Sequence, residues 1–221
     1  MTTKVFSAAL VGLDAAPVEV EVDISGGLPK VIVVGLPDTA IQEARERVKS
    51  AIKNSNAIFP PSRVAVNLAP ADLPKNGTHF DLPIAISILL NSGQIFFDPK
   101  NKLFVGELAL DGNLRAVSGI LPIALMAKQL GFKQLFIPKD NNQEAGLVDG
   151  IEIIPIKNLY EIIGYLQNLI KIAPLPKPNW NRFLKSPETL FDMKLIKGQE
   201  AAKRALEIAA AGGHNILKLY S

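Results

Sequence analysis

Three side chains that could take part in chemistry lie close together in sequence, between residues 78 and 81. Thr78, His79 and Asp81 follow a loop that contains glycine and precede a long apolar run. The apolar run at residues 64–68 before the loop predicts a buried strand, and the run that ends at residue 90 predicts a buried helix. The loop between them is expected near the surface. Free amides at a helix start point at whatever lies in front of them, so this order of elements is common in active sites.

The same residues also have purely structural interpretations. Thr78 or Asp81 could accept a hydrogen bond from the first amides of the helix, and Asp81 is the better cap because Pro83 then falls in the first turn. Asp72 and Asp81 could bind a metal ion together with His79. A loop acceptor and a helix cap explain these carboxylates with fewer assumptions, so no metal site is predicted.

The elements around this segment follow from hydrophobic spacing. Residues 4–12 and 17–24 are strand-like, and in the second segment valines and isoleucine alternate with Glu19, Glu21 and Asp23, which predicts a half-buried antiparallel strand with the acids on a solvated face. The apolar run at residues 31–34 predicts a central strand.

A helix is predicted next, with Thr39 and Gln42 spaced as a capping box. Its apolar stripe consists of Ile41, Ala44, Val48, Ala51 and Ile52. Its outer face carries four cations that could follow a nucleic-acid backbone, namely Arg45, Arg47, Lys49 and Lys53. Glutamates lie between them, and this mixture favours an ordinary solvated face.

The remaining pattern alternates strands and helices. Asp111-Gly112 predicts a hairpin turn within residues 102–117. A helix at 121–130, strands at 134–137 and 151–154, and a helix at 158–169 complete a mixed α/β unit. Prolines around Trp180 predict an extended linker, and a further helix is expected at residues 198–211.

Composition narrows the functional classes. The chain has no Cys, which excludes disulfides and thiol chemistry and fits a reducing compartment. No apolar window reaches the length of a membrane span. Residues 1–170 carry 15 Lys and Arg against 17 Asp and Glu, whereas residues 171–221 carry 9 against 4. The basic balance therefore belongs to the tail, where a short basic linker is a commoner explanation than a nucleic-acid surface.

Three long segments resemble the ComM/YifB family of magnesium-chelatase-like AAA+ ATPases, which is linked to natural transformation. They are VNLAPADLPKNGTHFDLPIAISIL, GELALDGNLRAVSGILPIALMAKQLGFKQLFIP and KGQEAAKRALEIAAAGGHNIL. The resemblance implies an N-terminal α/β (α+β) domain with the Lon-protease-like fold, also known as the ribosomal-protein domain-2-like fold. It also implies an AAA+ module that uses ATP and Mg, assembles into a hexameric ring and moves DNA junctions in the cytoplasm.

The resemblance also predicts which residues stand at the catalytic positions of a Lon-type peptidase. Lon-type proteases use a Ser nucleophile and a Lys base. In the matching segments His79 stands at the Ser position and Leu121 at the Lys position, so both are vestigial dyad positions and no catalytic residue is predicted. Thr78 and Ser118 carry hydroxyl groups close in sequence to these two positions. The sequence offers neither hydroxyl a base at the matching place.

The ATPase chemistry is expected to be incomplete as well. Family members continue from the GGHN segment into a P-loop, and this chain contains no Gly-Lys dipeptide. The resemblance places Ile196, Lys197, Gly198 and Gln199 on the adenine side of a complete module. Without a phosphate cradle the chain is expected to bind no cofactor and to hydrolyse no ATP.

The predicted organisation is a Lon-like domain at 1–170, a Pro-rich linker at 171–191 and a truncated start of an AAA+ module at 192–221. The preferred function is non-catalytic: the domain supports assembly of the ring, or binding of DNA or a partner, with no membrane involved. A Lon-like serine peptidase with an altered active site and a nucleic-acid-binding module are the alternatives.

Overall fold

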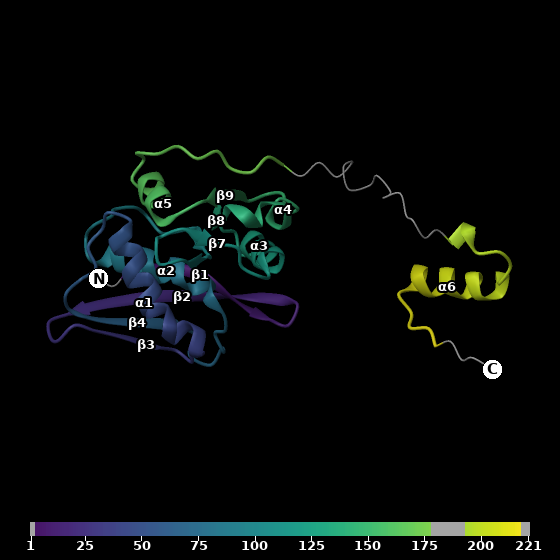
Figure 1. Cartoon of the computed structure of the whole chain (residues 1–221), viewed down its shortest axis with the longest axis horizontal. Helices are drawn as coiled ribbons and strands as arrows, with labels where there is room; N and C mark the ends of the chain where they lie inside the picture. The colour runs from purple at the N-terminus through teal and green to yellow at the C-terminus, as the bar shows by residue number, and fades with distance from the viewer. Residues whose placement is uncertain (1–2, 178–192, 218–221) are drawn as a thin grey trace. The chain divides into compact units, whose positions relative to one another are not determined.

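The computed structural model describes residues 3–177 and 193–217, which fall into two units divided between residues 178 and 179 (Figure 1). The predicted linker lies largely outside the described residues, and Trp180 lies wholly outside them. The strands of the first unit are β1 (Lys4–Val11), β2 (Asp14–Ser25), β3 (Lys30–Val34), β4 (Arg63–Ala69), β5 (Lys102–Phe104), β6 (Glu107–Leu108), β7 (Leu114–Arg115), β8 (Gln134–Pro138) and β9 (Glu152–Ile156).

The helices of this unit alternate with the strands along most of its length. The α-helices are α1 (Thr39–Asn54), α2 (Asp81–Asn91), α3 (Ile120–Gln129), α4 (Asn142–Ala145) and α5 (Leu159–Leu166), and the 3-10 turns are η1 (Thr78–Phe80) and η2 (Lys139–Asn141). The predicted mixed α/β class is confirmed.

Seven strands form one mixed sheet in the order β3-β4-β2-β1-β5-β8-β9. β1 and β2 pair antiparallel, as do β2 and β4, while the other neighbours are parallel. The alternation in β2 has the predicted consequence: Val18, Val20 and Val22 are buried. Glu21 on the opposite face accepts a hydrogen bond from Asn67, which lies directly across from it on β4.

The prediction that residues 31–34 form a central strand is wrong. β3 is an edge strand that pairs only with β4. Val31 and Val33 pack against the core, whereas Val34, on the other face of β3, is half exposed. A strand that is apolar on both faces can therefore still lie at the edge of the sheet, with a neighbouring strand on one side only.

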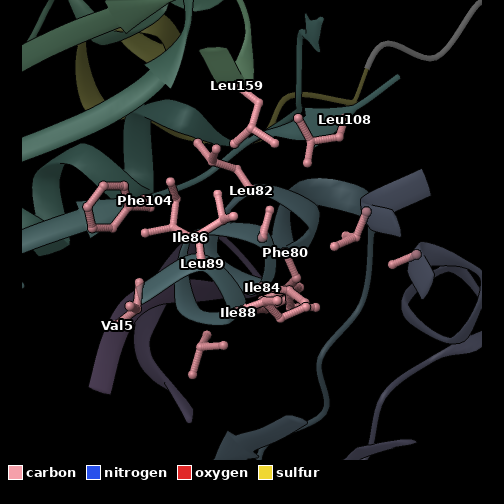
Figure 2. Close-up of a cluster of buried hydrophobic side chains, with 14 of the residues drawn as sticks. Val5, Phe80, Leu82, Ile84, Ile86, Ile88, Leu89, Phe104, Leu108 and Leu159 are labelled. Atoms are coloured by element: carbon pink, nitrogen blue, oxygen red, sulfur yellow. The ribbon is translucent and has the colours of Figure 1, made fainter. Parts of the chain in front are cut away.

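Two hydrophobic clusters occupy opposite faces of the sheet. On β1, Val5 and Ala9 belong to one cluster and Ala8 belongs to the other, as the two-residue period of a strand requires. α1, α2 and α5 pack on the first face, and α3 with α4 covers the second. α2 is buried almost all round, and Figure 2 shows its side chains beside Val5 and Phe104 of the sheet.

Local signals explain the starts of two helices and one hairpin turn. α1 buries the predicted stripe, but its cap is Asp38, whose carboxylate accepts the amide of Ile41, and not Thr39. Asn158 caps α5 in the same manner. Asp111 and Gly112 lie in the turn between β6 and β7, which is a short hairpin.

The second unit contains η4 (Met193–Leu195) and α6 (Glu200–Gly212). Gly213 follows the helix in the left-handed conformation, and this ends the helix where the double glycine predicted. None of the helix residues is buried within the unit.

Candidate functional site

Asp38 holds the loop before η1 against the start of α1. Its two carboxylate oxygens accept the amides of Ile41 at 2.9 Å and Gly77 at 2.8 Å. The loop was expected near the surface, yet Lys75 within it is fully buried and its Nζ donates to the carbonyl of Pro70. Burial lowers the pKa of Lys75, partly offset by the charge of Asp72. The loop is therefore held by Asp38 at Gly77 and by the internal hydrogen bond of Lys75.

The predicted cap at Asp81 is wrong. Phe80 is the N-cap of α2 and contributes no side-chain hydrogen bond. The carboxylate of Asp81 instead accepts Arg47 Nε at 2.7 Å, Arg47 Nη2 at 3.0 Å and the amide of Leu108 at 3.2 Å. We call this arrangement the Arg47–Asp81 clamp. It joins α1, α2 and β6, and the side chain of Asp81 is only 1% exposed.

The clamp perturbs both ionisable groups. Burial raises the pKa of Asp81 to about 6, although the hydrogen bonds and charge of Arg47 act in the opposite direction. The hydrogen bond to Asp81 raises the pKa of Arg47. At pH 7 the carboxyl group is therefore ionised and paired with the guanidinium. A buried pair of this kind is costly to break, since either partner alone would leave a charge in a poorly solvated place.

His79, at the first vestigial dyad position, is a buried residue of η1. Its Nε2 lies 2.8 Å from the carbonyl oxygen of Ala8 on β1, and because a carbonyl only accepts, this nitrogen carries the proton. Burial lowers the pKa of His79, so the neutral form is favoured. The ring also contacts the ring of Phe80, with 4.3 Å between the ring centroids and an angle of 35° between the ring planes. The imidazole therefore connects η1 to the sheet.

Leu121, at the second vestigial position, lies in the first turn of α3. Its side chain is partly buried against the second hydrophobic cluster, and its amide donates to Glu144 of α4 at 2.8 Å. An aliphatic side chain accepts no proton. Neither vestigial position carries the group that a Ser-Lys dyad requires.

Thr78 has a partner that sequence reasoning missed. Its hydroxyl donates to a carboxylate oxygen of Glu107 on β6, and the other oxygen of Glu107 lies 3.4 Å from Arg115. The sequence separation of 29 residues gave no local signal for this contact. A hydroxyl on a carboxylate is the geometry of a nucleophile and base, but it is equally a structural bond between η1 and β6.

The predicted nucleic-acid residues divide into two groups. The side chain of Arg47 is 19% exposed and its guanidinium is paired with Asp81, so it lies apart from the other three cations. Arg45, Lys49 and Lys53 line a groove of about 740 Å³ beside β3, where Lys30 joins them. We call this the α1 groove.

The α1 groove has a mixed chemical character. Glu43 and Glu46 also line it, together with apolar side chains such as Val31 and Phe59. Arg45 donates to the carbonyl oxygen of Val31 at 3.4 Å, which ties the helix to the edge strand. Four cations against two carboxylates give the lining a small positive excess.

Ile196, Lys197, Gly198 and Gln199, predicted for the adenine side of an ATPase, lie between η4 and α6 and are exposed. Gln199 precedes the helix in the left-handed conformation. Within this chain these residues have no phosphate-binding loop beside them in sequence.

The described residues show no group of three or more His, Asp or Glu side chains that could hold a metal ion. In the same residues no helix combines the length and apolar character needed to cross a bilayer.

The fold defines a class: a mixed α/β domain, part of which is similar in sequence to Lon-type proteases. The similarity to Lon is partial: 95 residues are 32% identical to Lon protease 2 of Bacillus subtilis, over 42% of this chain and 17% of that protein. The family pattern for subunit ChlI of Mg-chelatase matches residues 20–141, and a second pattern, also for magnesium chelatase subunit ChlI, matches residues 192–220.

The chain belongs to the magnesium-chelatase ChlI family and is a ComM/YifB-like member of it. It is 43% identical over 218 residues to the uncharacterized protein YifB of Escherichia coli, covering 96% of this chain and 41% of YifB. It is 42% identical over 219 residues to the competence protein ComM of Haemophilus influenzae, covering 97% of this chain and 42% of ComM. The chain thus spans less than half the length of these relatives.

Proposed function

We propose that this chain forms the N-terminal part of a ComM-like AAA+ ATPase that acts on DNA in recombination during natural transformation. In this proposal the first unit is a non-catalytic platform for ring assembly or DNA binding. One observation supports the non-catalytic role most: His79 is buried and hydrogen-bonded to Ala8, and Leu121 packs in a hydrophobic cluster. Both vestigial positions have structural partners in place of a nucleophile and a base.

ATP hydrolysis would belong to the larger protein. In this proposal nucleotide and Mg are held mainly by an ATPase module to which residues 192–221 belong. Self-association into a ring is proposed on the same basis. The mass in solution of this chain, measured beside a version extended through a complete ATPase module, tests it. If neither version exceeds the mass of a monomer with ATP present, the ring proposal is wrong.

DNA binding is proposed for the α1 groove, where Lys30, Arg45, Lys49 and Lys53 line one depression. Filter binding to single-stranded and forked DNA at two salt concentrations tests this proposal, because phosphate contacts weaken steeply with salt. The double variant Lys49→Ala/Lys53→Ala should bind more weakly than the parent chain at low salt. Absence of any DNA binding by the parent chain at low salt would refute the DNA contact.

A second candidate function is hydrolysis by an altered Lon-like site, which the Thr78–Glu107 contact favours. A fluorogenic casein assay discriminates between the two. The non-catalytic proposal predicts no turnover by the parent chain. Turnover that is abolished by Thr78→Val and retained by Ser118→Ala would establish Thr78 as a nucleophile and overturn that proposal.

A further inference from the structure

A second groove with basic side chains lies at the opposite end of the sheet from β3. It has a volume of about 760 Å³ and is bordered by the N-terminal ends of β5, β8 and β9. Four lysines line it, namely Lys100, Lys102, Lys133 and Lys177, and the carboxylates on its border are Asp149 and Glu152. We call this the lysine groove. None of its residues was singled out by the sequence pattern.

The lysines of this groove come from separate parts of the chain and are brought together by backbone hydrogen bonds. The carbonyl of Asn101 accepts the amides of Lys133 at 2.8 Å and Gln134 at 3.1 Å. The carbonyl of Lys133 accepts the amide of Glu152 at 3.0 Å. Three chain segments are thereby fixed side by side, so the cations converge through the fold and not through a run in the sequence.

The segment after α5 completes the groove. The amide of Leu175 donates to the carbonyl of Ile153 at 2.8 Å, and its side chain packs against the second hydrophobic cluster. This anchor places Pro174 and Lys177 on the border of the groove. The lysine groove therefore lies where the chain leaves the first unit.

The charges in the lysine groove are available to a ligand. Lys100 and Lys133 are exposed, and among the residues that the structure describes neither forms an ion pair. The two carboxylates on the border already accept hydrogen bonds, Asp149 from the amide of Gly150 and Glu152 from Gln134. Four cations against two anions make the lining positive, although residues 1–170 as a whole carry more acidic than basic side chains.

We infer that the lysine groove binds the phosphate backbone of a nucleic acid. The groove is open and its donors are flexible lysine heads, which suits a polyanion contacted along its length better than one enclosed phosphate. This inference rests on the proposed DNA-acting function and adds to it a second contact surface beside the exit of the chain.

The experiment measures duplex DNA affinity of the 221-residue chain as a function of salt. Log affinity falls linearly with log salt, and removing two lysine–phosphate contacts makes this slope shallower by roughly 1.8. We expect this reduction, with weaker binding at low salt, for Lys100→Ala/Lys133→Ala. The matched control is Lys139→Ala/Lys157→Ala, which removes the same charge from exposed positions outside the groove. Thermal unfolding followed by circular dichroism verifies that both variants fold.

The outcomes separate this inference from the function on which it rests. If the parent chain binds DNA and the two double variants lose the same affinity and slope, net charge explains the effect and the lysine groove is not a site. If inorganic tripolyphosphate displaces DNA at equal phosphate concentration, a small polyphosphate is the ligand and the nucleic-acid assignment is wrong. If the parent chain fails to bind DNA at low salt, the proposed DNA contact fails with it.

Discussion

Arg47 and Asp81, 34 residues apart in sequence, share two hydrogen bonds of 2.7 Å and 3.0 Å that connect the first two helices. Removing the guanidinium would leave a carboxylate that is 1% exposed without its counter-charge. We expect Arg47→Ala to lower the free energy of unfolding by about 3 kcal/mol, measured by urea denaturation at pH 7. Arg45→Ala is the control, since Arg45 is exposed on the same helix, and its effect should stay below about 1 kcal/mol. Equal losses in the two variants would contradict a stabilising clamp.

Asp81 should also make stability depend on pH. Its pKa of about 6 in the folded chain lies above 3.8, the value expected when unfolded, so the folded state binds more protons between these values. The carboxyl group therefore contributes stability that is present below pH 3.8 and is lost as the pH rises through 6, by about 3 kcal/mol in total. Urea denaturation of the parent chain and of Asp81→Asn at pH 4 and pH 7 measures this. The parent chain should gain relative to the variant at the lower pH, and a constant difference would refute the assignment.

Gly35 follows the edge strand with a φ of +102°, and a Cβ at this position would collide with the carbonyl oxygen of Leu68. Gly35→Ala should therefore destabilise the chain by about 3 kcal/mol, because both the backbone conformation and the close approach to β4 oppose a side chain. Gly26→Ala is a matched control, since a Cβ there meets nothing within 4 Å. Thermal unfolding of the two variants should differ clearly, and similar melting temperatures would show that β3 shifts to accommodate the methyl group.

Glu43 and Glu46 provide an independent test of the α1 groove, because they line it beside the cations. If phosphates lie there, Glu43→Gln/Glu46→Gln removes two repulsive charges and should strengthen DNA binding several-fold at low salt, with a smaller gain at high salt. The control is Glu144→Gln/Glu161→Gln, which neutralises two carboxylates outside the groove. Equal gains in both double variants would show that net charge alone is responsible.

Sequence patterns predicted the features of the fold that depend only on residues close to one another in sequence. The alternation in β2 predicted its buried valines, and the five-residue stripe predicted the buried face of α1. The edge position of β3 escaped prediction because an apolar run does not report how many strands lie beside it. The cap of α1 shifted by one residue because Asp38 accepts amides from both the helix and the loop, and only the fold brings Gly77 to it.

The candidate site was harder to predict, because its contacts join residues far apart in sequence. Asp81 has the position of a helix cap, and only the approach of Arg47 makes it the centre of a buried pair. Glu107 meets Thr78 for the same reason. The lysine groove depends on three backbone segments whose adjacency no spacing rule contains. The vestigial positions His79 and Leu121 came from a family resemblance, and the structure adds the partners that now hold them.

The contacts of Leu175 determine where a fragment of the first unit should end. Its amide donates to the carbonyl of Ile153 on β9 and its side chain packs against a hydrophobic cluster, although it lies beyond the last helix of the first unit. A fragment cut at residue 170 would lose the contact of Leu175 with β9 and remove Pro174 and Lys177 from the border of the lysine groove. Fragments intended for solution work should therefore retain the chain through residue 177.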